Sequence, residues 1–165
     1  MSGAGTARRV PDVVDKLTPH FERVIIVLTE NASRVASQRE FALIEGVQVV
    51  DSYFDELILP YPPEGVVLVA PCTFNSLNKL ANGIADTLAL SIAAEAIGRG
   101  TPVVVAVSVN PPLYAHPRTR ASIEVLRSWG VTVIDPAEYN GWLTLADDEV
   151  IVGATLQARE RYAAD

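Results

Sequence analysis

The fold is decided by residues 66–76, which read Val-Val-Leu-Val-Ala-Pro-Cys-Thr-Phe-Asn-Ser. An apolar, β-branched run stops at a proline, small polar residues follow, and a long apolar helical pattern begins at residue 77. This order is typical of a buried parallel strand that opens onto the amino end of a helix. Parallel α/β sheets bind phosphates and flat cofactors at such junctions, so we expect the functional site here.

Strand and helix patterns alternate along the rest of the chain. Runs rich in β-branched residues predict strands at residues 23–28, 47–50, 66–70, 102–109 and 131–134. Apolar residues at helical spacing predict helices at residues 8–17, 38–45, 77–99 (one helix or two), 117–129 and 150–162. Residues 51–64 include three prolines and are predicted to form a surface loop. Continuous apolar strands between helices favour an α/β fold whose parallel sheet is covered on both faces.

Length and composition indicate one globular domain over residues 1–165. The net charge is −7 and no basic run extends beyond Arg8-Arg9, which disfavours nucleic acid and anionic membranes as partners. Cys72 is the only cysteine, so an internal disulfide and a zinc site of several thiolates are excluded. The spacing of the carboxylates indicates no metal site. Because the longest apolar stretch, residues 87–97, is too short to span a bilayer, we expect a cytoplasmic protein.

The first residues resemble a turn that follows a strand. Residues 2–6 read Ser-Gly-Ala-Gly-Thr, like the turn after a first strand, although no strand pattern precedes them. Either the start is truncated or misassigned, or the missing sheet edge is supplied in another way, and both readings stay open. The backbone of Gly3 and Gly5 and the hydroxyl of Thr6 could bind a phosphate, unless these residues form a flexible terminus. Thr29, after a predicted strand, could donate to the same phosphate or cap the next helical turn.

The loop after the deciding strand offers several polar groups to one ligand. The hydroxyls of Thr73 and Ser76 and the amide of Asn75 could satisfy the carbonyl and nitrogen edge of a flavin ring, or could cap the following helix, or both. Cys72 is interpreted first as a small buried hydrophobic residue. Asn110 follows a strand and precedes Pro111, so its amide could bind a carboxylate or only complete a turn.

The two histidines do not indicate a hydrolase. His116 precedes a proline at a helix start, where capping or packing is the first interpretation, and His20 stands in a proline-containing loop. Neither has an obvious serine or aspartate partner, which disfavours a catalytic triad.

At this point the sequence resembles the homo-oligomeric flavin-containing cysteine decarboxylases, a superfamily that also contains flavin prenyltransferase. The resemblance rests on residues 3–17, Thr29, residues 71–88 and residues 103–117, and it is most specific in Leu-Ala-Asn-Gly-Ile-Ala-Asp at residues 80–86. The family's Pro-Ala-Ser-Ala-Asn-Thr motif falls on residues 71–76, which keep its proline and asparagine. Its Pro-x-Met-Asn-x-x-Met-Trp motif falls on residues 107–114, which keep only the asparagine, Asn110.

The resemblance implies a flavodoxin-like or Rossmann-like sheet with helices in three layers that binds FMN, with FAD as the alternative. It further implies oxidation of a cysteine-type substrate thiol to a thioaldehyde, followed by loss of carbon dioxide as an enethiolate. Asn110 would hold the substrate carboxylate as the catalytic residue. The cofactor would be held by Gly3, Gly5, Thr6, Thr29, Pro71, Cys72, Thr73, Phe74 and Asn75. The family assembles as homotrimers, often grouped into homododecamers, and the apolar helix at residues 87–97 is consistent with such burial.

The chain departs from the family pattern at one catalytic position. The decarboxylases carry a histidine shortly before the strand at residues 66–70, where this chain reads Asp55-Glu56-Leu57-Ile58. Two other functions therefore stay open beside a decarboxylase of a peptide C-terminal cysteine or a phosphopantothenoylcysteine-like thiol. One is a flavin-binding regulatory subunit without catalysis, and the other is a flavin prenyltransferase, although residues 109–112 replace the prenyltransferase segment Arg-Glu-Thr-Pro.

Overall fold

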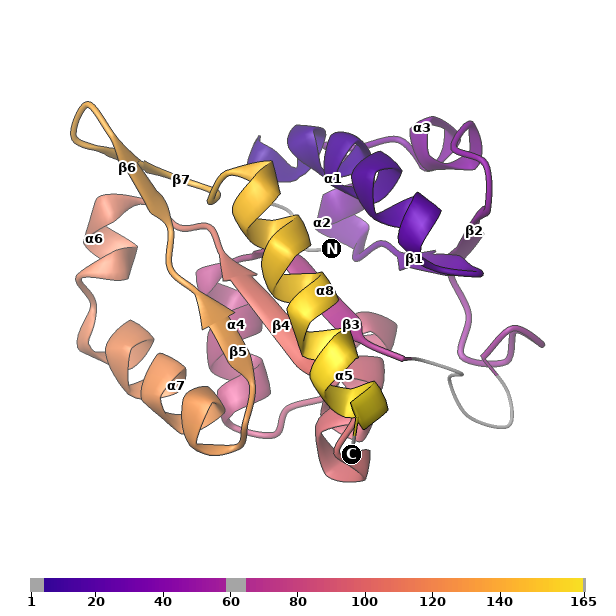
Figure 1. Cartoon of the computed structure of the whole chain (residues 1–165). Coiled ribbons are helices and arrows are strands. Elements are labelled where there is room, and N and C mark those ends of the chain that lie inside the picture. The colour runs from indigo at the N-terminus through magenta and orange to yellow at the C-terminus, as the bar shows by residue number, and fades with distance from the viewer. Residues whose placement is uncertain (1–4, 59–64, 165) are drawn as a thin grey trace.

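The computed structural model describes residues 5–58 and 65–164, so Gly3 and the loop prolines predicted at residues 60–63 lie outside it. Strands and helices alternate as the sequence predicts (Figure 1). The strands are β1 (Val24–Val27), β2 (Val47–Val50), β3 (Val67–Cys72), β4 (Val103–Val107), β5 (Thr132–Ile134), β6 (Ala137–Tyr139) and β7 (Trp142–Thr144). The α-helices are α1 (Val10–Leu17), α2 (Glu30–Ser33), α3 (Gln38–Ala42), α4 (Phe74–Ala81), α5 (Leu88–Arg99), α6 (Pro111–Tyr114), α7 (Pro117–Ser128) and α8 (Asp148–Ala164), and the 3₁₀ turns are η1 (Gly5–Arg9) and η2 (Thr18–His20).

The parallel strands form two separate groups. β1 pairs with β2, with Val24 opposite Val47, while β3, β4 and β5 form a second group in which Val67 lies opposite Val103. Every residue of β4 is buried, because strands flank it on both sides and helices cover both faces. No pairing joins β1 to β3 within the part of the chain that the structure describes.

Helices cover both faces of the strands and give three layers. On one face α4, α5 and α7 pack on β3 and β4 through a cluster that includes Leu77, Leu80, Leu90 and Leu126. On the other face α1 and α8 pack on the same strands through Val13, Leu17, Leu145 and Ile151. Figure 1 shows α8 lying across β3 and β4. The predicted three-layer parallel α/β fold is confirmed.

The helix ends explain where the sequence predictions miss by a few residues. The predicted helix at residues 77–99 is two helices, because Gly83 has φ +68° and the chain turns between α4 and α5. The first of them begins at Phe74 since Thr73 caps it, and Thr87 caps the second. Gly100 ends α5 with φ +76°, as expected of a glycine at a helix end. The helix predicted at residues 38–45 already ends at Ala42, and Gly46, with φ +79°, lies in the turn before β2.

Some short elements were not predicted. They are α2, α6 and an antiparallel hairpin of β6 and β7, whose turn residues Asn140 and Gly141 both have positive φ. The apolar helix α5 needs no subunit contact to explain its composition. Its apolar residues are buried or half-buried, and Leu90, Ala93 and Ala96 pack inside the molecule. No described helix is long and apolar enough to cross a membrane.

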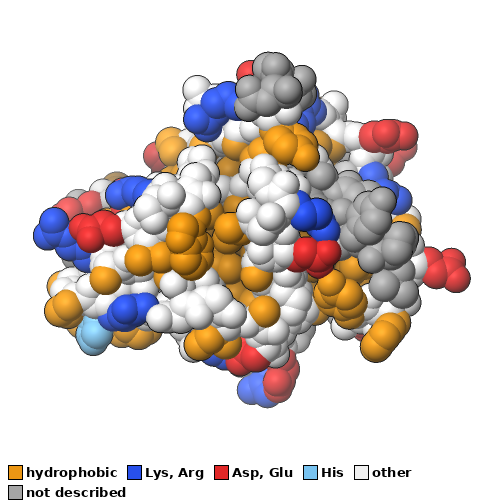
Figure 2. Space-filling model, turned by 90° about the horizontal axis from the view of Figure 1, so that it is seen from below, with side chains coloured by type: hydrophobic (Ala, Val, Ile, Leu, Met, Phe, Trp, Pro, Cys, Tyr) orange, Lys and Arg blue, Asp and Glu red, His pale blue; other side chains and the backbone are white. Residues whose placement is uncertain are grey.

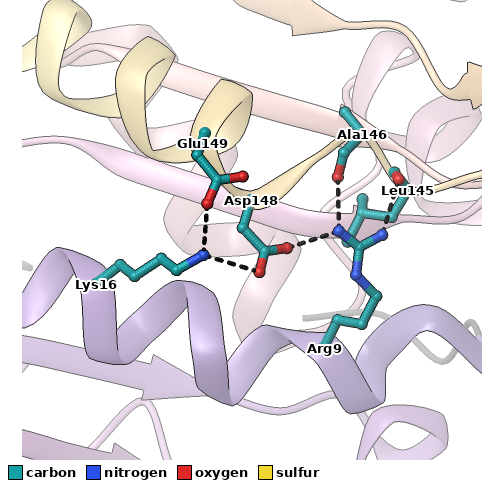
Figure 3. A network of polar contacts seen from close by, with 6 residues as sticks. All are labelled: Arg9, Lys16, Leu145, Ala146, Asp148 and Glu149. Carbon is teal, nitrogen blue, oxygen red and sulfur yellow. Dashed lines mark hydrogen bonds and ion pairs between the residues drawn. The ribbon is translucent and has the colours of Figure 1, made fainter.

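A polar network fastens the last helix to the first (Figure 3). Arg9 donates to the carbonyls of Leu145 and Ala146 at 3.0 and 3.2 Å and to Asp148 at 2.6 Å. Lys16 contacts Asp148 and Glu149, and its hydrogen bond with Glu149 raises the pKa of Lys16 and lowers that of Glu149. Asp148 and Glu149 stand in the first turn of α8, where negative charge stabilises a helix.

Candidate functional site

Three segments far apart in the chain meet beyond the carboxyl ends of β3 and β4. The hydroxyl of Thr6 in η1 lies 2.7 Å from the hydroxyl of Ser108, the first residue after β4. The backbone N–H of Ser108 in turn donates to the carbonyl of Cys72 at 2.9 Å. Thr6 therefore lies at the sheet edge where ligands of open α/β sheets bind, as its predicted role requires.

Pro71 and Cys72, at the end of β3, are buried beneath this edge of the sheet. The Ala70–Pro71 peptide bond is cis, and the Cys72 side chain is fully buried among the residues that support α4 and α5. Burial raises the pKa of the Cys72 thiol from 9.0 to about 12. The thiol is therefore a neutral packing group, in agreement with its first interpretation. Its role in holding a cofactor stays a prediction, and only the backbone of Cys72 could make that contact without movement of the side chain.

The first turn of α4 carries the residues predicted to face a flavin ring. The Thr73 hydroxyl accepts the backbone N–H of Ser76 at 3.4 Å and lies 3.2 Å from the Ser76 hydroxyl, so the predicted cap is present. Asn75 is exposed, and the half-buried Phe74 ring meets the His116 ring edge-on at a centroid distance of 5.3 Å. These side chains lie at the edge that the sequence indicates, and a contact with a cofactor remains a prediction for each of them.

Thr29 and Gly5 lie at the same side of the fold as the other candidate phosphate ligands. Thr29 follows β1 and caps α2, its hydroxyl oxygen accepting the N–H of Ala32 at 3.3 Å. Gly5 is exposed at the start of η1. A hydroxyl that accepts a capping bond still has its own hydrogen to donate, so Thr29 keeps a donor suited to a phosphate oxygen.

Asn110 is held in one orientation by the helix that follows it. Its side-chain oxygen accepts the N–H of Leu113 at 3.0 Å and so caps α6, which leaves the two N–H groups of the amide for another acceptor. Tyr114 fixes the far end of α6 by donating to Asp135 at 3.0 Å, and burial is the first cause that raises the pKa of Tyr114. Asp135 is also paired with Arg127 at 2.8 Å. The amide of Asn110 is therefore exposed but well positioned.

His116 stands at a helix start and His20 in the segment before β1, as the sequence predicts. His116 caps α7 by accepting the N–H of Arg118 at 3.0 Å on Nδ1, and His20 belongs to η2, near the start of β1. In the segment that replaces the family histidine, Asp55 accepts the N–H of Leu57 at 2.9 Å and Ile58 is buried. No histidine stands at that position.

Two features of this region were not predicted from the sequence. Ser108 is only 7% exposed and links η1 to β3, yet a serine at a strand end is too common to be recognised without its partner. The hairpin of β6 and β7 projects from the body of the molecule (Figure 1). It carries Tyr139 and Trp142, which are 73% and 74% exposed. The hairpin has a sequence signal, because Asn140-Gly141 between Tyr139 and Trp142 is a typical two-residue hairpin turn.

The fold defines a parallel α/β protein, and its candidate ligand site lies beyond the carboxyl ends of β3 and β4. The chain belongs to the Flavoprotein family, whose model matches residues 1–157. It is 32% identical over 152 residues to the coenzyme A biosynthesis bifunctional protein CoaBC of Mycobacterium bovis, an alignment that covers 89% of this chain and 35% of that protein. The chain thus spans about a third of the length of this curated relative.

Solved structures share the fold. A PPC decarboxylase mutant complexed with pantothenoylaminoethenethiol superposes with a TM-score of 0.81 at 21% identity, over 96% of this chain and 94% of that one. The FMN-dependent cysteine decarboxylase TvaF from thioviridamide biosynthesis gives a TM-score of 0.75 at 22% identity, over 96% and 94% of the two chains. The fold implied by the resemblance is confirmed, and so is membership of a flavoprotein family.

Proposed function

We propose that the protein is an FMN-dependent oxidative decarboxylase of a cysteine-type thiol, either a peptide ending in cysteine or a phosphopantothenoylcysteine-like molecule. The observation that carries the proposal is the convergence of neutral donors and one oriented amide at a single sheet edge. Thr6 and Ser108 are in contact there, and Asn110 stands two residues beyond Ser108. The CoaBC relative and the decarboxylase structures support the same activity class.

The residues at this edge suit a flavin phosphate and ring. Thr6 and Thr29 offer hydroxyl donors, and Gly5 offers exposed backbone. Such a set of donors can bind a phosphate without a cationic side chain. Thr73, Phe74 and Asn75, together with the backbone of residues 71 and 72, would hold the ring. A bound flavin supplies the two-electron acceptor for oxidation of the substrate thiol.

Asn110 would hold the substrate carboxylate. Its oxygen is committed to the α6 cap, so the amide can present only N–H donors outward, and these match a carboxylate. Since α6 is fastened through Tyr114 and Asp135, the amide needs little reorganisation when substrate binds.

The test is reconstitution followed by turnover. Purified protein is mixed with FMN, and the visible absorbance of bound flavin is recorded. Peptides ending in cysteine and phosphopantothenoylcysteine are then added without oxygen, and flavin bleaching and carbon dioxide release are measured. We expect both signals with at least one thiol. Protein that stays colourless with excess FMN would show that it does not bind the flavin, which contradicts the proposal.

The decisive variant is Asn110→Ser, because serine keeps a helix-capping oxygen and removes the amide donors. We expect FMN absorbance and melting temperature to stay close to those of the parent. Loss of one charge-assisted hydrogen bond, about 1.5–3 kcal/mol, should lower kcat/KM by about tenfold to a hundredfold. Full activity in this variant would show that Asn110 only completes the turn.

One observation favours a second candidate, a flavin-binding subunit without catalysis. The family histidine is replaced by a segment whose Asp55 serves only a local turn, so the acid–base role has no clear residue. The two candidates separate in the anaerobic mixing experiment. Bound flavin that keeps its colour with every thiol supports the subunit.

We further propose that the protein assembles as a homotrimer or as a homododecamer of four such trimers. We also propose that it is located in the cytoplasm. Ile84, in the tract at residues 80–86 that carries the most specific resemblance, is 45% exposed in the isolated chain and would be covered by a neighbour. Light scattering coupled to gel filtration measures the mass directly. A monomeric mass at micromolar concentration would contradict the oligomer.

A further inference from the structure

Asparagine followed by glycine occurs twice in the chain, at residues 82–83 and 140–141. Such a pair can rearrange without an enzyme. The backbone nitrogen of the glycine attacks the side-chain amide carbon of the asparagine, and ammonia leaves with the proton of that nitrogen as a succinimide ring closes. Water then opens the ring, either to an ordinary aspartate or to an aspartate linked through its β-carboxyl group. Glycine favours the attack because it has no Cβ to hinder its nitrogen.

The pair at residues 140–141 forms the turn of the hairpin of β6 and β7. Asn140 has φ +49° and Gly141 has φ +78°, and positive values at both central residues are the mark of a type I′ turn. Both residues are exposed, and a Cβ built on Gly141 would meet nothing within 4 Å. Among the hydrogen bonds of the described residues, none engages the Asn140 side chain or the Gly141 N–H. The attacking nitrogen and the amide under attack are therefore both uncommitted.

The hairpin must open before the ring can close, because the attack needs a backbone rotation at Asn140 that the turn does not allow. Opening costs little here. β6 and β7 have three residues each, and they pair only with one another among the strands that the structure describes. A two-stranded hairpin of this kind is marginally stable. Brief local opening therefore gives Asn140 access to the reactive geometry.

The pair at residues 82–83 has the same chemistry in a different setting. Both residues are exposed, but the Asn82 amide donates to the carbonyl of Asn78 at 2.6 Å and accepts from Arg118 at 2.6 Å. The N–H of Gly83 donates to the carbonyl of Leu80 at 3.0 Å. Hydrogen bonds thus hold both reacting groups in place, and the pair is an internal control.

The two pairs lie on different sides of the molecule. The hairpin projects at the upper left of Figure 1. The turn between α4 and α5, which contains residues 82–83, lies on the lower side, the side that Figure 2 shows. Modification of one pair is therefore not expected to change the surroundings of the other.

We propose that Asn140 is a site of spontaneous succinimide formation and deamidation, and that hydrogen bonds protect Asn82 from the same reaction. The ordinary aspartate adds one negative charge and keeps the turn, because aspartate also tolerates positive φ. The β-linked product adds an atom to the main chain of a two-residue turn, so Tyr139 and Trp142 no longer stay opposite each other. The modification thus changes how the hairpin presents its two exposed aromatic side chains. This inference does not require the proposed function.

The experiment uses the full chain, incubated at mildly alkaline pH, where loss of the amide proton of glycine speeds the attack. Samples are digested at acidic pH, and the peptides that contain residues 82 and 140 are compared by mass spectrometry. Electron-transfer fragmentation distinguishes the ordinary from the β-linked aspartate. We expect conversion at Asn140 and about tenfold less, or lower still, at Asn82. In urea both sites should convert at similar rates, because the hydrogen bonds of Asn82 are then lost.

Matched variants test the site and the opening step. Asn140→Gln cannot close the succinimide ring, so it should remove the main acidic species that isoelectric focusing detects in the incubated protein. Trp142→Ala removes the cross-strand aromatic pair with Tyr139 and should speed conversion at Asn140 by about twofold to fivefold. Trp129→Ala, which changes an exposed tryptophan at the end of α7, should leave that rate unchanged.

The proposal is overturned if Asn140 stays intact in the native protein while the urea-unfolded chain converts. Equal conversion of the two sites in the native protein would overturn the protection of Asn82. An unchanged rate in Trp142→Ala would overturn the opening step. None of these readouts depends on FMN or on turnover.

Discussion

At the scale of single residues, the site is built from side chains that also hold the fold. Thr29, Thr73 and Asn110 each follow a strand and cap the next helix. Capping could be predicted from the sequence because it depends on near neighbours. The contact between Thr6 and Ser108 could not, since it joins residues 102 positions apart.

Cys72 gives a prediction at this scale. Because burial raises its pKa to about 12, the native thiol should not react measurably with a disulfide reagent at pH 8, while the urea-unfolded chain should react completely. Rapid reaction of the native protein would show that the sulfur is accessible.

The raised pKa of Cys72 also makes the stability of the fold depend on pH. The unfolded cysteine loses its proton near pH 9.0 and the folded one near 12, so the stabilising contribution of the neutral thiol is complete below 9 and is lost as the pH rises toward 12. Cys72→Val should flatten this part of the stability profile, measured by urea unfolding between pH 8 and 11.

At the scale of elements, most helices and strands could be predicted and the short ones could not. β1 to β5 were found because β-branched runs are a local signal, whereas α2 and α6 have only four residues each and depend on their caps. The pairing of strands into two groups depends on contacts that no local pattern records.

The network between α1 and α8 predicts a clear difference between two cationic residues. Arg9→Ala removes hydrogen bonds to Leu145, Ala146 and Asp148 in a partly buried place, so unfolding free energy should fall by about 1–2 kcal/mol. Lys16→Ala, in the adjoining helix α1, should leave it nearly unchanged because Lys16 is 43% exposed and its nearer partner, Glu149, is 78% exposed. Chemical denaturation of both variants is the measurement. Equal losses would mean that the buried geometry of Arg9 is not what matters.

The hairpin of β6 and β7 carries a prediction about substrate. Trp142 on β7 is 74% exposed, and β6 begins two residues after Asp135, the hydrogen-bond partner of Tyr114 in α6. We therefore expect Trp142→Ala to raise KM for a peptide substrate several-fold while FMN absorbance and kcat stay close to the parent values. Leu43→Ala serves as a matched control, since Leu43 is 80% exposed at the end of α3. Unchanged KM in Trp142→Ala would remove the hairpin from the substrate site.

At the scale of the whole molecule, the sequence predicts a parallel sheet covered on both faces, and the structure adds that the described parallel strands form two groups, β1-β2 and β3-β4-β5. The apolar pocket between these two groups could not be predicted, because α1 and α5 line it from opposite faces of the strands.

The separate small core around Phe41 has a consequence for how the molecule comes apart. Ile26, Ala36 and Phe41 pack together with Val10 and Val14, apart from the clusters on β3 and β4, and α1 takes part in both. The region of β1 and β2 should therefore behave as its own cooperative unit and melt first. Denaturation followed by exchange in residues 24–50 should show an earlier midpoint than in residues 103–134, and coincident midpoints would mean that α1 couples both halves into a single transition.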